Sequence, residues 1–280
     1  MSRLLTKEEG SQAINISAEH ISAFSVGFTR ITGKDHEEDA EVAGSGTLVQ
    51  ANGCYAILTA AHVLDYLATS TKVGLVLLMR GESVVHRYIL PMQFVRLEYV
   101  ARASKTAKGP DLGLLVLPSS EAKKIEATKA SKVFYNIDRR RDQMLLTPRA
   151  LDLGGWFLCG SVGDWTTDLP TEHPYTRVKG IRALCGAGCV SLERVDNEFD
   201  YLNFEVNYDE GYGGPQDFRG FSGGGLWQAV FKDNGGHIVL EDMLLSGVAF
   251  YQLEMENGKT LICHGRKSIY ANALSKLLTT

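Results

Sequence analysis

The sequence contains the stretch Arg219-Gly220-Phe221-Ser222-Gly223-Gly224-Gly225-Leu226-Trp227, in which one serine stands among glycines and two apolar residues follow. Glycine adopts backbone conformations that other residues reach only at a cost, and it lets another part of the chain approach closely. A serine in such a turn is exposed and has backbone N–H groups around it, as a nucleophile beside an oxyanion hole requires. A plain turn between two strands has the same composition, so this interpretation depends on the rest of the chain.

A histidine and an aspartate upstream support the catalytic interpretation. His62 follows three small residues (59–61), which let a tight helical turn start directly after a strand-like segment. Asp111 stands after a Gly-Pro turn, at the mouth of a wholly apolar segment. We expect Asp111 to orient the imidazole of His62, and His62 to activate Ser222. Asp65 is the rival partner of His62, but its position three residues later indicates that it only ends the turn.

The pattern along the whole chain predicts an all-β fold. Short apolar segments are separated by glycine and charged turns, as is typical of barrels and sandwiches. The strand-like segments are 21–31, 44–49, 55–58, 73–78, 88–99, 112–117, 156–159, 176–184, 188–192, 201–206, 224–231, 243–253 and 260–264. Residues 119–141 have a helical pattern, and a closing helix is expected over 269–278 with Ser268 as its N-cap.

The composition favours a globular protein without a nucleic-acid or membrane role. The 280 residues are 44% hydrophobic, enough for one large domain or two small ones with cores of their own. Lys and Arg total 29 against 33 Asp and Glu, so the net charge is −4, whereas phosphate binding needs a concentrated positive face. We therefore expect no nucleic-acid partner. No segment resembles a signal peptide or a membrane span, so we expect no membrane partner either.

The five cysteines are odd in number and widely scattered, which predicts free thiols in a reducing compartment. Cys185 and Cys189 have the spacing of half a metal site, but no second half with matching spacing exists. We therefore expect no metal, no cofactor and a cytoplasmic, intracellular location.

Three motifs in this order resemble those of the chymotrypsin/trypsin-like serine peptidases. They are Gly44-Ser45-Gly46-Thr47 leading to Thr59-Ala60-Ala61-His62, then Asp111-Leu112-Gly113-Leu114-Leu115, then Gly220-Phe221-Ser222-Gly223-Gly224. The resemblance covers about residues 21–278. It implies two antiparallel six-stranded β-barrels, with the site in the cleft between them and a C-terminal helix. The expected division is an extension (1–20), a first barrel (21–118), a partly helical connection (119–145), a second barrel (146–266) and the helix (267–280).

The resemblance also implies a role for each site residue. Ser222 Oγ would attack a peptide carbonyl, His62 would act as general base and then general acid, and Asp111 would stabilise the imidazolium. The backbone N–H groups of Gly220 and Ser222 would form the oxyanion hole. The implied activity is that of a serine endopeptidase acting on a protein or peptide.

Two departures from the secreted animal members of this family point to its bacterial or intracellular branch. Phe221 stands where those members have the aspartate that receives the new N-terminus after zymogen cleavage, so this activation switch is absent. Val63 follows His62, so the disulfide that usually brackets the histidine loop is absent too. The chain after Ser222 leaves no room for a peptide-binding PDZ domain. A neighbouring gene product is the candidate regulatory or substrate partner.

The resemblance places the specificity pocket beside the serine loop. Its expected substrate-binding residues are Gln216, Asp217, Arg219, Phe250, Tyr251 and Gln252, with Cys263 and His264 on the adjoining strand. Gln216 falls at the floor position. A neutral amide there gives no charge preference, so we expect no strict selection of Arg or Lys before the scissile bond.

Two alternatives remain from the sequence. A peptidase fold can serve as a binding module that holds a peptide in its cleft without cutting it. An α/β-hydrolase-type esterase also uses a GxSxG turn, but its acid and histidine follow the serine. Asp233, His237 and His264 are available for that arrangement, although the segment after Ser222 is mostly strand-like.

Overall fold

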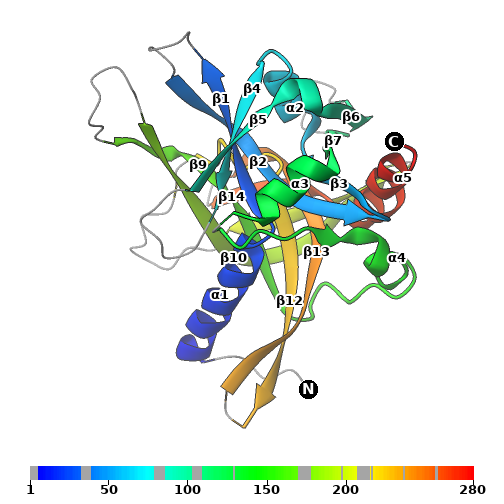
Figure 1. Cartoon of the computed structure of the whole chain (residues 1–280). Coiled ribbons are helices and arrows are strands. Elements are labelled where there is room, and N and C mark those ends of the chain that lie inside the picture. Colours follow the sequence, from blue (N-terminus) through cyan, green and yellow to red (C-terminus); the bar gives the residue numbers. More distant parts are fainter. Residues whose placement is uncertain are drawn as a thin grey trace.

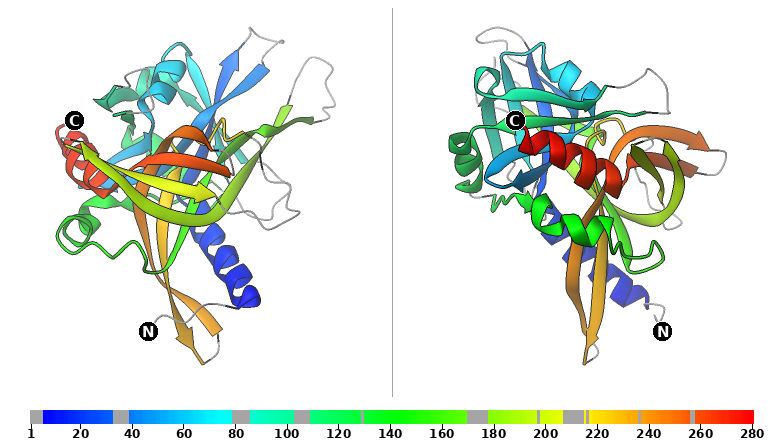
Figure 2. Two further views of the ribbon diagram at one scale, coloured as in Figure 1. Left: turned by 180° about the vertical axis from the view of Figure 1, so that it is seen from behind. Right: turned by 90° about the vertical axis from the view of Figure 1, so that its right-hand side faces the viewer.

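The computed structural model describes residues 6–32, 39–78, 86–102, 109–128, 130–169, 178–196, 198–206, 215, 217–235, 237–255 and 258–280. Two β-sheets form the body of the molecule, and helices pack around them (Figures 1 and 2). This arrangement confirms the all-β fold with two antiparallel sheets and a C-terminal helix. It also excludes the α/β-hydrolase alternative, which needs a parallel sheet.

The first sheet has eight strands, in the order β5-β4-β1-β2-β3-β7-β6 with β8 paired to β2. The strands are β1 (Ser25–Thr32), β2 (Asp39–Ala51), β3 (Cys54–Thr59), β4 (Lys72–Leu77), β5 (His86–Pro91), β6 (Arg96–Ala101), β7 (Leu112–Leu117) and β8 (Tyr135–Asn136). All pairs are antiparallel except β2–β8. The sequence predicted a closed six-stranded barrel here, whereas the described strands form an open sheet. Among the described strands, β5 and β6 are the two edges of this sheet and do not pair with each other.

A proline explains one difference in this sheet. The single strand expected over 88–99 is divided into β5 and β6 by a 3₁₀ turn, Met92–Phe94. Pro91 precedes the turn and has no N–H to donate to a strand ladder, so pairing stops there. The chain then turns away and pairs with β7 instead of continuing along β4.

The second sheet is a closed six-stranded barrel in the order β10-β11-β14-β13-β12-β9, as expected. Its strands are β9 (Gly155–Leu169), β10 (Val178–Asp196), β11 (Phe199–Val206), β12 (Gly225–Asn234), β13 (His237–Met255) and β14 (Gly258–His264). The serine loop leads directly into β12. The long β12–β13 hairpin projects from the body at the bottom of Figure 1.

The N-terminal segment contains a helix that the sequence interpretation missed. Helix α1 (Lys7–Ser22) begins with a capping box, in which the Thr6 hydroxyl accepts the Glu9 N–H and the Glu9 carboxylate accepts the Thr6 N–H. Ile21 is fully buried as part of this helix, so the strand expected from residue 21 begins at Ser25. The T-x-x-E signal was available in the sequence.

The other helices are α2 (Ala61–Leu67), α3 (Ser119–Glu126), α4 (Ile137–Leu145), a π-helical segment (Ser268–Ala273) and α5 (Leu274–Leu278). The helical connection is thus two helices with β8 between them. Ser268 does not cap the closing helix. It lies inside the helical segment, and its hydroxyl donates to Asp200 Oδ1 at 2.8 Å. Figure 2 shows α4 beside the closing helix on the outside of the sheets.

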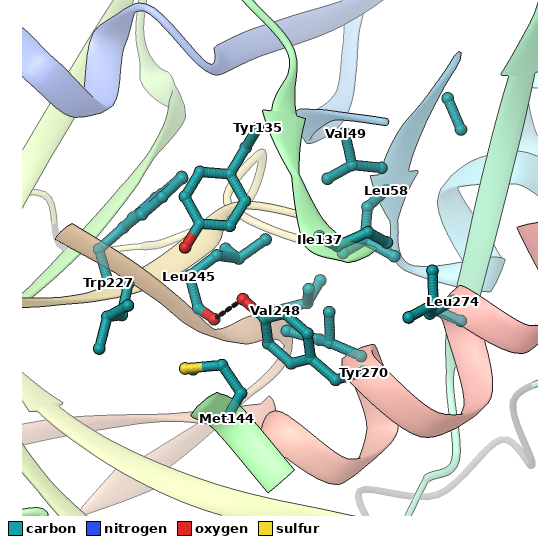
Figure 3. Close-up of a cluster of buried hydrophobic side chains, with 14 of the residues drawn as sticks. Val49, Leu58, Tyr135, Ile137, Met144, Trp227, Leu245, Val248, Tyr270 and Leu274 are labelled. Atoms are coloured by element: carbon teal, nitrogen blue, oxygen red, sulfur yellow. Dashed lines mark hydrogen bonds between the residues drawn. The ribbon is translucent and has the colours of Figure 1, made fainter. Parts of the chain in front are cut away.

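The largest core cluster joins the two sheets and the closing helix (Figure 3). Leu58 comes from the first sheet, Trp227 and Leu245 come from the second, and Tyr270 comes from the C-terminal segment. The Tyr270 hydroxyl donates to the Leu245 carbonyl at 2.8 Å. β3 ends just before His62 and β12 begins just after Ser222, and both strands run through this cluster. The cluster therefore fixes these two strands relative to each other.

Within the described residues, no helix has both the length and the apolar character needed to cross a bilayer.

Candidate active site

His62 is placed by the junction between β3 and α2. The strand ends at Thr59, and α2 starts at Ala61, so His62 lies in the first turn of the helix. Val63 and Leu64, which follow His62 in this helix, are fully buried. The His62 side chain is 45% exposed. The packed neighbours therefore hold the backbone while the imidazole stays accessible.

Asp111 holds His62 through both carboxylate oxygens. Asp111 Oδ2 lies 2.5 Å from His62 Nδ1, and Asp111 Oδ1 accepts the backbone N–H of His62 at 2.9 Å. A carboxylate only accepts, so Nδ1 carries the proton and Nε2 has its lone pair free. Asp65 is not the partner, because its Oδ1 accepts the Tyr99 hydroxyl at 2.8 Å. The tautomer of His62 with the proton on Nδ1 is the one that a general base requires.

The serine loop has the backbone conformation that its glycines suggest. Gly220 has φ +97° and Gly223 has φ +89°, both in the left-handed region where side chains are strained. Phe221 N–H donates to Phe218 O at 2.9 Å, and Gly223 N–H donates to Ala249 O at 2.7 Å. These bonds tie the loop to itself and to β13.

Two amide groups of the loop are unpaired. Within the described chain, neither the N–H of Gly220 nor the N–H of Ser222 donates a hydrogen bond. The intervening N–H of Phe221 and the following N–H of Gly223 are both paired. One unpaired N–H donor therefore lies on each side of Phe221, which is the alternation expected for an oxyanion hole.

Ser45 of the first sheet anchors the serine loop of the second half. Its backbone N–H donates to the Ser222 carbonyl at 2.8 Å, and its hydroxyl donates to the Gly220 carbonyl at 2.5 Å. The same hydroxyl accepts the Ser161 N–H at 2.8 Å. The sequence pattern Gly44-Ser45-Gly46-Thr47 was recognised, but this role of Ser45 was not.

Close packing brings Ser222 beside the segment that carries His62. A methyl group built on Gly44 would lie 2.7 Å from Val63 Cγ2 and 3.0 Å from the Ser222 carbonyl oxygen. No hydrogen bond joins Ser222 Oγ to the His62 imidazole in the part of the chain that is described. Such bonds are commonly long before substrate binds.

A second histidine, His264, is buried and supports Asp111 from the opposite sheet. His264 Nε2 accepts the Asp111 backbone N–H at 2.9 Å, and the His264 ring stacks on Phe250 with centroids 4.6 Å apart. Burial lowers the pKa of His264 to about 4, so it is neutral and remains an acceptor at physiological pH. Sequence reasoning named His264 as a neighbour of the pocket and as a candidate histidine of the α/β-hydrolase alternative. Its apolar strand context indicated burial but not this partner.

The expected pocket residues have different environments. Gln216 lies outside the described residues. The Asp217 carboxylate accepts the Arg219 backbone N–H at 2.8 Å and lies 2.5 Å from Arg219 Nε, so the two side chains pair with each other. Gln252 Oε1 accepts the N–H of Phe218 at 2.9 Å, which joins the serine-loop segment to β13.

The remaining two pocket residues point in different directions. Tyr251 is 42% exposed, whereas Phe250 is buried against His264 and Tyr201. The Phe250 side chain is therefore a core contact behind Asp111.

Phe221 fills an apolar site under the loop. Its ring is buried, and it packs edge-on against Phe218 with centroids 5.1 Å apart. No charge is buried at this position, so the loop conformation depends on apolar packing and on the bonds to Ser45.

Among the described residues, no group of three or more His, Cys, Asp and Glu side chains is placed to hold a metal. All five cysteines are free.

Comparisons with known proteins give little beyond these observations. No family model matches the chain, and no curated protein matches it. One solved structure to which it is similar is described as "Aromatic interactions drive the coupled folding and binding of the intrinsically disordered Sesbania mosaic virus VPg protein". That similarity covers 90% of this chain and 90% of the other, with 12% identity and a TM-score of 0.43, which is too low to support a functional conclusion.

Proposed function

We propose that this chain is a serine endopeptidase that acts through Ser222, His62 and Asp111. The observation that carries the proposal is the pairing of His62 with Asp111 through two hydrogen bonds, beside a serine loop with two unpaired N–H groups. A histidine with only a structural role is usually buried. The His62 side chain is 45% exposed, and yet Asp111 fixes the orientation of its ring. This combination is what base catalysis needs.

The mechanism follows from the positions of the donors and acceptors. His62 Nε2 takes the proton of Ser222 Oγ as that oxygen attacks a peptide carbonyl, and His62 then gives the proton to the leaving amine. The Asp111 carboxylate stabilises the imidazolium through Nδ1–H. The N–H groups of Gly220 and Ser222 face the carbonyl oxygen as it becomes negative, each contributing roughly 3–4 kcal/mol to the transition state. Water then hydrolyses the acyl-enzyme by the same route.

A fluorophosphonate probe tests the nucleophile directly. We expect the purified chain to be labelled at Ser222, as located by peptide mass spectrometry, and we expect Ser222→Ala to abolish labelling. Ser191→Ala is the matched control, because Ser191 is exposed on β10 and takes no part in the site. Cleavage of a denatured, fluorescent casein then distinguishes a peptidase from an esterase. Ser222→Ala should lower kcat by about 10⁶.

Two outcomes would reject the proposal. Labelling at a different serine would move the nucleophile elsewhere, and a fully folded wild-type chain without any labelling would favour the binding-module alternative. In the second case, a cooperative melting transition must show that the unlabelled chain is folded.

The cellular setting belongs to the same proposal. We place the enzyme in a reducing cytoplasm because its five cysteines are free thiols. The departures at Phe221 and Val63 favour the bacterial or intracellular branch of the family it resembles. Its substrate or regulator would be a protein, and a neighbouring gene product is the first candidate. Neither statement changes the chemistry of the site.

A further inference from the structure

Two cysteines face each other across neighbouring strands of the second barrel. Cys185 of β10 is directly opposite Cys159 of β9 in the antiparallel register. Directly opposed residues have Cα atoms about 4.5–5.5 Å apart, which lies within the range of about 4.4–6.8 Å that a disulfide spans. The two thiols also hydrogen-bond to each other. Neither belongs to the proposed catalytic site.

A cavity gives small molecules access to this pair. Its volume is about 220 Å³, and both cysteines line it together with Ile14, Ala18 and Ser22 of α1. A water molecule occupies about 30 Å³ in the liquid, so the cavity has room for a small oxidant. Helix α1 forms one wall of the cavity and contacts both β9 and β10.

A buried ammonium group stands behind the cavity wall. Lys132 Nζ donates to the carbonyls of Ser22, Ser25 and Leu78, at 2.9 Å for Ser25 and 2.5 Å for Leu78. Ser22 and Leu78 themselves line the cavity. Lys132 is almost fully buried, and burial lowers its pKa to about 7. The protonated form of Lys132 favours a negative charge on Cys159, although this effect is smaller than those of the hydrogen bonds.

This environment favours the thiolate of Cys159. The hydrogen bond from Cys185 lowers the pKa of the Cys159 thiol against the opposing effect of burial, and Ser25 and the Lys132 ammonium act in the same direction. A thiolate is the reactive form of cysteine. By contrast, burial raises the pKa of the Cys263 thiol, and Cys189 of β10 is opposite Glu205 rather than a cysteine.

We propose that Cys159 and Cys185 form a thiol-oxidation site that a small hydroperoxide converts into an intramolecular disulfide. The Cys159 sulfur attacks the peroxide, an S–O bond forms as the O–O bond breaks, and the leaving alkoxide takes a proton to become an alcohol. The Cys185 sulfur then attacks the sulfur of Cys159, and the displaced hydroxide takes the Cys185 proton to become water. Two thiols and one hydroperoxide give one disulfide, one alcohol and one water.

The test is disulfide mapping of the folded, full-length chain. Cleavage after Lys and Arg places Cys159 in peptide 150–177, whereas Cys185 and Cys189 share peptide 183–194. A Cys189→Ser background therefore removes the ambiguity. The protein is reduced, freed of reductant, treated with cumene hydroperoxide and alkylated. We expect peptides 150–177 and 183–194 to be joined, with the mass of two hydrogens lost, and dithiothreitol to separate them.

The matched control is Cys185→Ser with Cys189 retained, four positions further along the same strand. We expect this variant to lose the cross-link at least tenfold relative to wild type, while dimedone traps the sulfenic acid on Cys159. Three results would overturn the proposal: a bond from Cys159 to Cys189, a bond between two chains that disappears on dilution, or a Cys159 that stays fully alkylatable when the exposed Cys189 is oxidised. If the Cys189→Ser protein does not fold, fragmentation of the joined peptides from the wild-type chain assigns the bond to Cys185 or to Cys189.

Discussion

His264 of β14 accepts a hydrogen bond from the backbone N–H of Asp111, at 2.9 Å, although Asp111 directly precedes β7 of the other sheet. Asp111 in turn binds His62 through both of its carboxylate oxygens. The residue that orients the imidazole is thus held in place from the opposite half of the molecule.

Replacing His264 with an apolar ring should weaken this support. His264→Phe keeps a ring against Phe250 but leaves the buried Asp111 N–H without an acceptor, which costs about 1–3 kcal/mol of unfolding free energy. His264→Gln retains an acceptor and serves as the control. Urea denaturation measures the difference, and equal stability of all three proteins would show that the bond contributes nothing.

The same histidine should give the stability a pH dependence. Its pKa is lowered from 6.5 to about 4 by burial, so the unfolded chain takes up the proton first as the pH falls. Stability from the neutral ring is complete above pH 6.5 and declines by about 3 kcal/mol towards pH 4. Asp111 and Asp200 favour its protonation and Arg194 opposes it, and all three remain in the variant. Between pH 6.5 and pH 4, the stability of wild type relative to His264→Phe should therefore fall by that amount, so that the variant becomes as stable as wild type or more stable. A stability difference that stays constant with pH would contradict the assignment.

Asp111→Asn should separate catalysis from folding. The amide retains one oxygen, but its NH₂ group would meet a donor, either the His62 backbone N–H or Nδ1–H, so the imidazole loses its required tautomer. We expect kcat to fall by about 10⁴ with little change in melting temperature. Asp65→Asn is the control, because Asp65 is exposed and pairs with Tyr99 and Arg102. Equal activity of the two variants would exclude Asp111 from the mechanism.

Gly223→Ala should damage the serine loop more than a change at an open glycine. A methyl group at Gly223 would overlap the Ser45 carbonyl and the Thr59 hydroxyl, whereas one at Gly53 meets nothing within 4 Å. Both residues have positive φ, 89° and 81°, so the backbone strain is matched. We expect Gly223→Ala to lose about 1–3 kcal/mol more stability than Gly53→Ala, together with fluorophosphonate labelling. Similar losses for the two variants would show that the loop can move aside.

The pairing of Asp217 with Arg219 makes a prediction about specificity. The carboxylate accepts two donors from Arg219, so it is not available to a basic substrate side chain. A peptide library varied before the scissile bond should show no strong preference for Arg or Lys, and Asp217→Asn should change the profile only a few-fold. A preference above about a hundredfold (about 2.7 kcal/mol) that disappears in Asp217→Asn would place this carboxylate at the pocket floor.

The sequence was sufficient where the signal is local. Strand patterning predicted the all-β fold, and the small residues before His62 predicted a helical turn at the end of a strand. The start of α1 was missed although Thr6 and Glu9 carry a local signal, because an apolar segment after residue 20 was interpreted as a strand.

The remaining differences depend on contacts between distant parts of the chain. Ser45 reaches Gly220, and Asp111 reaches His264, across separations that no periodicity encodes. The same holds for Cys159 and Cys185, whose opposition depends on the register of two long strands. The first two pairs follow from how the two sheets pack and the third from strand register, neither of which the sequence pattern specifies.

Three of the hydrogen bonds of Ser45 have a consequence for how the molecule opens. They connect a strand of one sheet to the loop and to a strand of the other, so the halves cannot separate at this point without exposing the carbonyls of Gly220 and Ser222. Local fluctuations would then leave this junction closed, and the Ser45 amide would exchange its hydrogen with solvent only when the whole molecule unfolds. We therefore expect the two halves of the site to unfold together. A chain in which one half is disordered would lose the geometry of the other half as well.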